Sequence, residues 1–385
     1  MRYRWPRQLL SSAAVEIIDG DRGKEYPKDS DFSDSGYCLF LNTGNVRPDG
    51  FDFSNCQFIS AEKDQRLRKG KLTRNDLVMT TRGTIGNIAY YDDNILYENL
   101  RINSGMVIFR TDASRLHPSF LYHFLRSPDF IGQTIAMRSG VAQPQFPIRD
   151  IKRVELSIPD LVVQKRIASI LSVYDDLIEN NRRRMALLEE AARQLYREWF
   201  VRLRFPGYEH TRITDGLPAG WGQIPLGEHV TLNYGKALKA DNRTNGPYPV
   251  HGSSGIVGYH EKPFTQGPGI VLGRKGNVGS VYWCSKNYWP IDTVYFIGAE
   301  KSNLWLYYAL QHMHFINTDV AVPGLNRDFA YSRSLLIPNH HLVSQFLDTA
   351  VPIHEQIDKL DEMNHKLRAA RDLLLPRLMN GEIAI

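Results

Sequence analysis

Apolar residues recur every seven positions through one long segment, residues 161 to 203, that contains neither proline nor glycine. One series is Ile167, Tyr174, Asn181, Leu188 and Leu195, and its companion is Leu171, Ile178, Met185, Ala192 and Trp199. Two such series form the a/d seam of a coiled coil. The pattern predicts a helix roughly 55 to 60 Å long, at a rise of about 1.5 Å per residue.

A second heptad pattern follows Pro352 near the C-terminal end. One seam position is held by Ile353, Leu360, Leu367 and Leu374, and the other by Ile357, Asn364, Arg371 and Leu378. The polar residues Asn364 and Arg371 weaken this pattern. Because an exposed apolar seam needs burial and the other seam can supply it, we expect the two helices to pair. Antiparallel pairing would relate the segments that precede the helices by an approximate two-fold axis.

The two segments that precede the helices have a mixed pattern of short strands, loops and one helix each. In the first segment we expect strands at 76–80, 87–91 and 104–109 and a helix at 118–126 that stops at Pro128. In the second we expect strands at 269–272, 280–283 and 293–297 and a helix at 303–310. Both segments are therefore predicted to be α+β domains.

Short motifs recur in the same order in the two halves of the chain. Arg82-Gly-Thr-Ile-Gly86 returns as Lys275-Gly-Asn-Val-Gly279, and Ile158-Pro159 returns as Ile337-Pro338. The repeat period of roughly 180 to 220 residues is an ordinary domain size. Two tandem, divergent copies, each followed by a long helix, are what a reader of two unlike half-sites requires.

Composition narrows the class of protein only moderately. Of 385 residues, 42% are apolar and 23% are charged, and no run of eighteen uncharged apolar residues occurs, so we expect a globular cytoplasmic protein. The three cysteines, Cys38, Cys56 and Cys284, form no CxxC pair and are interpreted as structural thiols. The net charge of +5 is compatible with a polyanionic partner but does not establish one.

A search for catalytic motifs finds none of the common ones. There is no GxSxG elbow, no GxxxxGK[ST] phosphate loop, no HExxH and no GxGxxG between a strand and a helix, and the histidines have no metal-ligand spacing. No Asp/Asn-Pro-Pro-aromatic run, as amino-methyltransferases use to hold a target base, is present either. We therefore expect no catalytic, cofactor or metal site in this chain.

Several loops are rich in side chains that bind nucleic acid. Arginine and lysine pair with guanine edges and phosphates, whereas asparagine and glutamine match adenine. For each residue a plain loop or turn role stays open, and Gly83, Gly86, Gly276 and Gly279 are interpreted as turn residues. The DNA-contact candidates are Thr81, Arg82, Thr84, Arg101, Asn103, Arg138, Gln143, Gln145, Lys236, Lys239, Ser253, Ser254, Arg274, Lys275, Asn277 and Arg327.

An ordered set of motifs resembles the specificity (S) subunits of type I restriction-modification systems. The set comprises Leu217-Pro-Ala-Gly-Trp221, Tyr248-Pro-Val-His-Gly-Ser253, Lys275-Gly-Asn-Val-Gly279, the Ile-Pro ends, and Glu179-Asn-Asn-Arg-Arg-Arg184 in the long helix. The resemblance spans essentially the whole chain. The first copy departs from it, because it lacks the Leu-Pro-x-Gly-Trp entry and begins almost directly at Trp5.

The resemblance implies an α+β protein with two target-recognition domains, residues 1–160 and 204–340, and two spacer helices, residues 161–203 and 341–385, that pair as an antiparallel coiled coil. Each domain would read half of a bipartite, asymmetric site in double-stranded DNA. The helices would dock two methyltransferase subunits, and two restriction subunits would complete the complex. S-adenosylmethionine, ATP and Mg would bind those partners and not this chain.

Three alternative interpretations remain open. The chain could be the recognition subunit of a bifunctional restriction-methylation enzyme outside type I. It could be a coiled-coil scaffold whose domains bind something other than DNA, such as carbohydrate on the aromatics Trp283, Tyr288 and Trp289. A lone enzyme is the third alternative, and it lacks a recognisable constellation.

Overall fold

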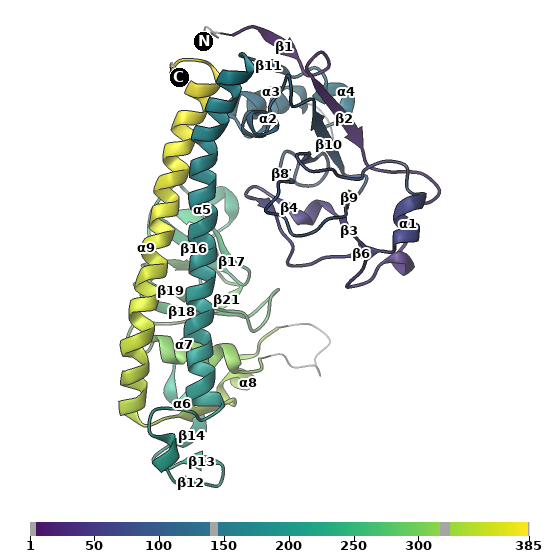
Figure 1. Ribbon diagram of the computed structural model, residues 1–385. Helices are drawn as coiled ribbons and strands as arrows, with labels where there is room; N and C mark the ends of the chain where they lie inside the picture. The colour runs from purple at the N-terminus through teal and green to yellow at the C-terminus, as the bar shows by residue number, and fades with distance from the viewer. Residues whose placement is uncertain (1–4, 139–144, 316–323, 384) are drawn as a thin grey trace. The chain divides into compact units, whose positions relative to one another are not determined.

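The computed structural model describes residues 5–138, 145–315, 324–383 and 385 (Figure 1). It divides into two compact units, of which unit 1 comprises Met1–Asn180 with Asn364–Ile385 and unit 2 comprises Asn181–Met363. Two long helices, α5 (Leu161–Tyr196) and α9 (His340–Met379), contribute a segment to each unit. Each unit therefore contains one globular α+β domain together with part of both helices.

The domains of the two units contain the same antiparallel four-stranded sheet. Its order is β2-β10-β7-β8 in unit 1 and β15-β21-β18-β19 in unit 2. The unit 1 strands are β2 (Val15–Asp19), β7 (Leu77–Thr80), β8 (Ile88–Tyr90) and β10 (Met106–Thr111). The unit 2 strands are β15 (Asn233–Tyr234), β18 (Gly269–Gly273), β19 (Val281–Cys284) and β21 (Val294–Ile297). The connectivity is identical strand for strand.

Two smaller sheets are duplicated as well. A three-stranded sheet has a central strand that pairs antiparallel with one neighbour and parallel with the other, in the orders β6-β3-β9 and β17-β16-β20. Its strands are β3 (Cys38–Leu41), β6 (Phe58–Ile59), β9 (Leu100–Ile102), β16 (Tyr248–Gly252), β17 (Gly255–His260) and β20 (Trp289–Pro290). A two-stranded ribbon ends each domain, β1 (Arg7–Leu9) with β11 (Glu155–Ser157) and β14 (Gly222–Pro225) with β22 (Ser334–Ile337).

The remaining elements are short. The α-helices are α1 (Ala61–Arg66), α2 (Pro118–Leu125), α3 (Pro128–Arg138), α4 (Ile148–Ile151), α6 (Leu226–His229), α7 (Leu304–His312) and α8 (Arg327–Tyr331). The ribbons β4 (Val46–Arg47) with β5 (Gly50–Phe51) and β12 (Ile213–Thr214) with β13 (Leu217–Pro218) complete the strands. Single 3₁₀ turns occur at Asp29–Asp31, Thr43–Asn45, Tyr208–His210 and Ala240–Asn242.

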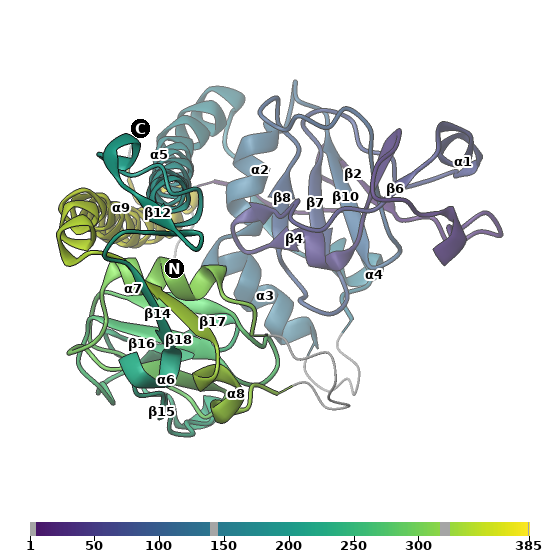
Figure 2. The ribbon, with the colours of Figure 1, turned by 90° about the horizontal axis from the view of Figure 1, so that it is seen from below.

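The long helices are part of the hydrophobic core of each domain. In unit 1, Ile167 and Leu171 of α5 and Leu375 of α9 pack in one cluster with Phe120 of α2 and Phe109 of the sheet. In unit 2, Ala192 and Tyr196 of α5 and Phe346 of α9 join Tyr308 of α7 and sheet residues in the same way. Figure 2 shows α7 between the sheet of unit 2 and the long helices. Each domain thus buries one face of its sheet under a short helix and the helix pair.

The heptad seams fall where the sequence predicts. Nine positions of the first seam pair lie in α5 and the tenth, Trp199, lies in the turn that follows it; these ten and all eight of α9 are buried or half-buried. The ends differ from the prediction. α5 passes into a π-helical turn at Arg197–Val201, and α9 ends at Met379, six residues before the predicted end. α9 also continues through Pro352 and Pro376; Pro352 is exposed, so water can reach the carbonyl left without its helical donor.

The polar seam residues of α9 are bound by α5 within unit 1. Asn364 is fully buried, and its Nδ2 donates to the Ile178 carbonyl at 3.3 Å. Arg371 Nη1 lies 2.5 Å from Asp175 Oδ1, and Arg126 Nη1 of α2 lies 2.8 Å from Asp175 Oδ2. The two segments are therefore antiparallel in unit 1, and Asp175 connects α5 to α2 and α9. A buried polar residue of this kind fixes helix register.

Unit 2 has a comparable polar connection. Tyr307 Oη of α7 donates to Glu189 Oε1 of α5 at 2.8 Å, and Tyr308 Oη lies 2.7 Å from His354 Nε2 of α9. Burial lowers the pKa of His354 to about 4. The imidazole is therefore neutral at pH 7, so it can share a hydrogen bond with Tyr308 without introducing a buried charge.

All three thiols are free. Cys38 and Cys284 are buried and Cys56 is half-buried, and burial raises the pKa of Cys38 to about 12. Within the described ranges, no set of three or more histidine, cysteine or acidic side chains is placed to hold a metal ion. None of the helices in that same part of the chain is both long and apolar enough to span a membrane.

Replacing Asp175 with alanine should destabilise unit 1 markedly. The change leaves the largely buried guanidiniums of Arg126 and Arg371 without their shared carboxylate, which costs about 3 kcal/mol for an ion pair of this burial. Thermal unfolding of Asp175→Ala measures the loss. Asp176→Ala is the matched control, because this neighbouring residue is exposed. Equal effects of the two variants would contradict the structural role of Asp175.

Stability should fall on mild acidification, before the carboxylates titrate. Burial lowers the pKa of His123, His251 and His354 to about 4 each, whereas an unfolded histidine titrates near 6.5. Between these values the unfolded chain binds protons that the folded chain does not, so folding free energy is lost as the pH falls from about 6.5 to about 4. The midpoint of thermal unfolding at pH 7.5, 6.0 and 5.0 measures this loss.

His354→Gln isolates one contribution to that pH dependence. Glutamine can keep a hydrogen bond to Tyr308 but does not titrate, so the pH dependence should be shallower than in the wild type. An unchanged slope would show that His354 does not contribute to the acid sensitivity.

Candidate nucleic-acid interface

In each domain a turn with two glycines joins two strands of the four-stranded sheet, the second and third in chain order. In unit 1 the turn joins β7 to β8, with Gly83 at φ 68° and Gly86 at φ 94°; in unit 2 it joins β18 to β19, with Gly276 at φ 77° and Gly279 at φ 79°. Side chains other than glycine rarely adopt these angles. The interpretation of these four glycines as turn residues is confirmed.

The two turns are closed by equivalent hydrogen bonds. Gly86 N donates to the Thr80 carbonyl at 3.0 Å, as Gly279 N does to Gly273 at 2.9 Å. Earlier in the turn, Thr81 N donates to the Gly105 carbonyl, and Arg274 N donates to the Thr293 carbonyl. Thr81 and Arg274 therefore occupy the same position, as do the residues that follow them, Arg82 and Lys275.

Arg82 and Lys275 are exposed cations at the same place in each domain. Within the described parts of the chain, neither forms a side-chain ion pair or hydrogen bond. The backbone around each is fixed by the turn, so the side chain leaves the domain from a defined point and remains free to bind an anion or a base edge. These are the best-placed of the predicted DNA contacts.

Other unit 1 candidates lie around the same turn. Arg82 and Gln145 line a pocket of about 170 Å³, and Thr84 is exposed on the turn. Asn103 is half-buried, and its Oδ1 accepts the Gly105 N–H at 2.9 Å. Gln143 lies outside the described residues, as does the side chain of Arg138, whose backbone ends α3.

The unit 2 candidates form a cationic, partly aromatic group. The guanidinium carbons of Arg274 and Arg327 lie 5.1 Å and 5.3 Å from the ring centre of Tyr234, which is 51% exposed. Both are within the range of a cation–π contact. The loop motifs of the sequence do not identify Tyr234 as a candidate DNA contact. The exposed candidates Asn277 and Ser254 lie on loops, as do Lys236 and Lys239.

Three residues that are expected to contact DNA are buried, and the prediction for each is corrected. Arg101 is 3% exposed, its Nε lies 2.8 Å from Asp64 Oδ1, and its Nη2 donates to the Asp64 carbonyl at 2.9 Å. Thr81 is buried and its hydroxyl donates to the Gly105 carbonyl at 2.9 Å. Ser253 is buried, and its carbonyl accepts the Ser280 hydroxyl at 2.7 Å. The side chains of Arg101 and Thr81 are therefore engaged within the domain, and that of Ser253 is buried.

The aromatic residues on which the carbohydrate alternative rests do not form an exposed surface. Tyr288 is fully buried, whereas Trp283 and Trp289 are half-buried. Trp289 Nε1 donates to the Lys236 carbonyl at 2.8 Å, which ties it to the domain. A sugar-binding platform would need exposed, adjacent rings, and these three do not supply one.

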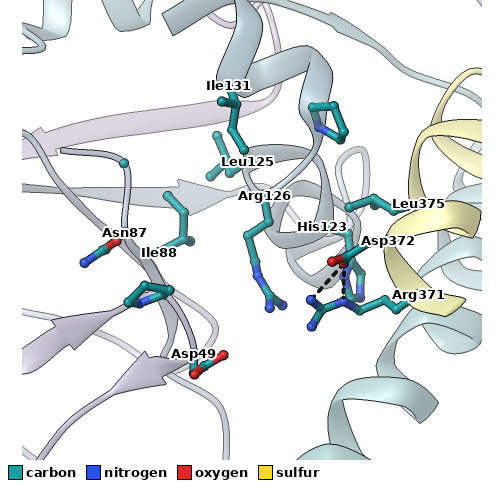
Figure 3. Close-up of a pocket in the computed structure, with 13 residues that line it drawn as sticks. Asp49, Asn87, Ile88, His123, Leu125, Arg126, Ile131, Arg371, Asp372 and Leu375 are labelled. Atoms are coloured by element: carbon teal, nitrogen blue, oxygen red, sulfur yellow. Dashed lines mark hydrogen bonds and ion pairs between the residues drawn. The ribbon is translucent and has the colours of Figure 1, made fainter. Parts of the chain in front are cut away.

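A larger pocket of about 420 Å³ lies in unit 1 beside α2 and α9 (Figure 3). Its two guanidiniums already have carboxylate partners, since Arg126 pairs with Asp175, and Arg371 with both Asp175 and Asp372. Burial lowers the pKa of His123, which also lines it, to about 4. The pocket therefore has the character of a structural junction and not of a catalytic centre.

The structure is that of a duplicated α+β protein with an exposed cation on the equivalent turn of each domain. Residues 15–190 match a family model described as "Type I restriction modification DNA specificity domain". The chain is therefore similar to the specificity subunits of type I restriction-modification systems.

Individual proteins are similar to this chain over most of its length. A type I restriction enzyme HindI specificity subunit from Haemophilus influenzae is 22% identical, over 94% of this chain and 98% of its own length. A MjaIX specificity subunit from Methanocaldococcus jannaschii is 21% identical, over 87% and 85%. The crystal structure of a type I S subunit from M. genitalium has a TM-score of 0.54 at 18% identity and covers 98% of this chain and 96% of that one. This likeness shows the shared fold.

Replacing the exposed turn cations should weaken DNA binding and leave stability unchanged. Arg82→Ala or Lys275→Ala should cost about 1 to 3 kcal/mol of binding by the assembled complex if the side chain contacts a base. Fluorescence anisotropy with target DNA, together with thermal unfolding of each variant, measures both effects. Unchanged affinity would assign the side chain to the turn alone.

Arg101→Ala should show the opposite behaviour and serves as the contrasting variant. It leaves the buried Asp64 carboxylate without its buried partner, so thermal stability should fall, by about 3 kcal/mol. A variant that kept full stability but lost DNA affinity would restore Arg101 as a DNA contact.

Proposed function

We propose that this chain is the specificity subunit of a type I restriction-modification complex and that it reads a bipartite, asymmetric DNA target. The family match and the duplicated domain carry the proposal. Each copy has an exposed cation, Arg82 or Lys275, on a glycine-fixed turn. One copy would read each half of the target, with several unread base pairs between the halves.

The half-sites are proposed to differ in sequence. The domains share strand order and turn geometry but differ in the side chains around the turn, where Thr84 is matched by Asn277 and Thr81 by Arg274. Because base edges are distinguished by their pattern of donors and acceptors, different side chains select different bases. A palindromic target would contradict this proposal.

The catalytic work is assigned to other subunits. Two methyltransferase and two restriction subunits would assemble with this chain, and would bind S-adenosylmethionine, ATP and Mg. The complex would then act as a DNA adenine methyltransferase and an ATP-dependent endonuclease on DNA in the cytoplasm. In unit 2 the α5 residue Leu187 is 70% exposed, and in unit 1 the α9 residue Leu373 is 71% exposed, which supports docking of partners on the helices.

Single-base sequencing of N6-methyladenine tests the proposal directly. DNA from a host that makes the complete complex, compared with a host lacking only this gene, should contain one split, asymmetric motif that depends on the gene. Its two halves should be unrelated in sequence. A continuous gene-dependent motif, or none when the methyltransferase subunit is shown to be present and active, would contradict the proposed function.

A further inference from the structure

In both domains the first strand of the four-stranded sheet ends beside the glycine turn. The residues at this position can be matched one by one between the domains. Asp19 ends β2 and pairs with Val107, and Tyr234 ends β15 and pairs with Tyr295. Val107 pairs in turn with Met79, the residue before Thr80, and Tyr295 pairs with Leu272, the residue before Gly273. Asp19 and Tyr234 therefore stand at the same point of the same sheet.

The next residue confirms the match independently. Gly20 and Gly235 both follow the strand, and each packs against a backbone carbonyl so closely that a Cβ would lie 2.2 Å from Asn103 O or 2.0 Å from Ile291 O. The helix that borders the position also corresponds. Phe146 N donates to the Thr81 carbonyl and Leu325 N to the Arg274 carbonyl, which makes Ile148 at the start of α4 equivalent to Arg327 at the start of α8.

In unit 1 this position is a pocket that contains a carboxylate. Asp19, Arg22 and Arg82 are among the residues that line its volume of about 170 Å³. Asp19 Oδ1 accepts the Gly20 N–H at 3.0 Å, and Arg22 Nη2 lies 3.2 Å from Oδ2. A carboxylate has about four acceptor positions, so Asp19 can accept a further hydrogen bond from a ligand.

In unit 2 the equivalent position holds cations and an aromatic ring. Tyr234 replaces Asp19, Arg274 replaces Thr81, and Arg327 replaces Ile148. Both guanidiniums lie against the Tyr234 ring, at 5.1 Å and 5.3 Å, and no carboxylate in the described part of the chain forms an ion pair with either. The carboxylate acceptor of the unit 1 position, Asp19, is thus replaced in unit 2 by an aromatic ring with two guanidinium donors against it.

This difference restricts which part of DNA the position can contact. Phosphates offer only acceptors and negative charge, so a carboxylate such as Asp19 is repelled by them. Base edges in the major groove offer both kinds of group, amino donors on cytosine and adenine and acceptors on guanine. If the same position contacts the same part of DNA in both domains, that part is a base edge.

We propose that this position is a specificity-determining site of each domain, with opposite polarity in the two. Asp19 accepts a hydrogen bond from the exocyclic amino group of a cytosine or adenine in one half-site. Arg274 and Arg327, held by the Tyr234 ring, donate to the acceptor edge of a guanine in the other. The inference rests on the proposed function, because it assigns bases to the same interface.

Substitutions in one domain should relax one half-site only. In the assembled complex, Asp19→Asn should reduce discrimination at one base of one half-site by roughly 5- to 150-fold and leave the other half-site unchanged. Arg327→Gln or Arg274→Gln should have the same size of effect at a guanine of the other half-site. Methylated-base sequencing from a host that makes each complex gives the motif, and the unchanged half-site shows that the complex has folded.

Matched controls lie in the same domains. Glu16→Gln removes an exposed carboxylate from the same strand as Asp19, and Arg212→Gln removes an exposed guanidinium from unit 2. Both should retain the wild-type motif. Tyr234→Phe should keep the motif because the ring remains, whereas Tyr234→Ala should relax the same base as the arginine variants.

The outcomes separate this inference from the proposed function. A wild-type motif that Asp19→Asn and the arginine variants leave unchanged overturns the inference and leaves the proposed function standing. A uniform loss of methylation at all sites, without relaxation at one base, also overturns it, because it indicates phosphate contacts or positioning of Arg22. A wild-type complex that methylates no split motif overturns both.

Discussion

Burial of the heptad seams on α5 and α9 is the constraint on which the rest of the structure depends. The main hydrophobic cluster of each domain includes residues of both helices. In unit 1 the sheet and α2 are covered by Ile167, Leu171 and Leu375, and in unit 2 the sheet and α7 are covered by Ala192, Tyr196 and Phe346. Seam residues such as Ile167, Leu171 and Ala192, and their neighbours on the same helices, thus stabilise the helices and the domains together, since most helical stability in proteins comes from packing of an apolar face.

Polar groups then determine how that packing is positioned. Apolar side chains alone would allow the helices to slide by a turn at little cost, because leucine packs against leucine in several registers. Asn364 bonded to Ile178, and Asp175 held between Arg126 and Arg371, each match only one register. The turns that carry Arg82 and Lys275 extend from domains whose attachment to the helices is fixed in this way. A recognition protein needs that fixation more than an additional increment of stability, because a base contact tolerates little displacement.

The sequence predicts the repeated elements well because period and punctuation are local signals. These local signals predict the seams, the α+β pattern and the glycine turns. They also predict the strands at 76–80, 269–272 and 293–297. The effect of proline on helix boundaries is harder to predict from the sequence. Pro128 ends α2 as predicted but also begins α3, where the first helical position suits its ring, and Pro352 lies inside α9.

Candidate site residues were harder still, because burial depends on partners far away in the chain. Arg82 and Arg101 look alike in sequence, yet Asp64, 37 residues before Arg101, draws only the latter into the interior. Asp19 and Tyr234 carry no motif at all. Only the matched registers of two sheets bring them to notice, and that comparison requires the pairing of strands that no local pattern contains.

The duplicated domain shows how a scaffold can keep its fold while its binding preference changes. The residues preserved in both copies are those with a steric requirement: Gly20 and Gly235 against a carbonyl, and the glycines of the turn at positive φ. The residues that differ, Asp19 against Tyr234 and Ile148 against Arg327, lie at the end of a strand or the start of a short helix and are half-buried or exposed. Because charge at such a position is solvated in the free protein, its sign can reverse at small cost in stability. Against a base edge in a desolvated interface, the same reversal exchanges a preference for amino groups for a preference for acceptors. In the proposed assignment, the residues that select bases are therefore largely different from those that the fold requires.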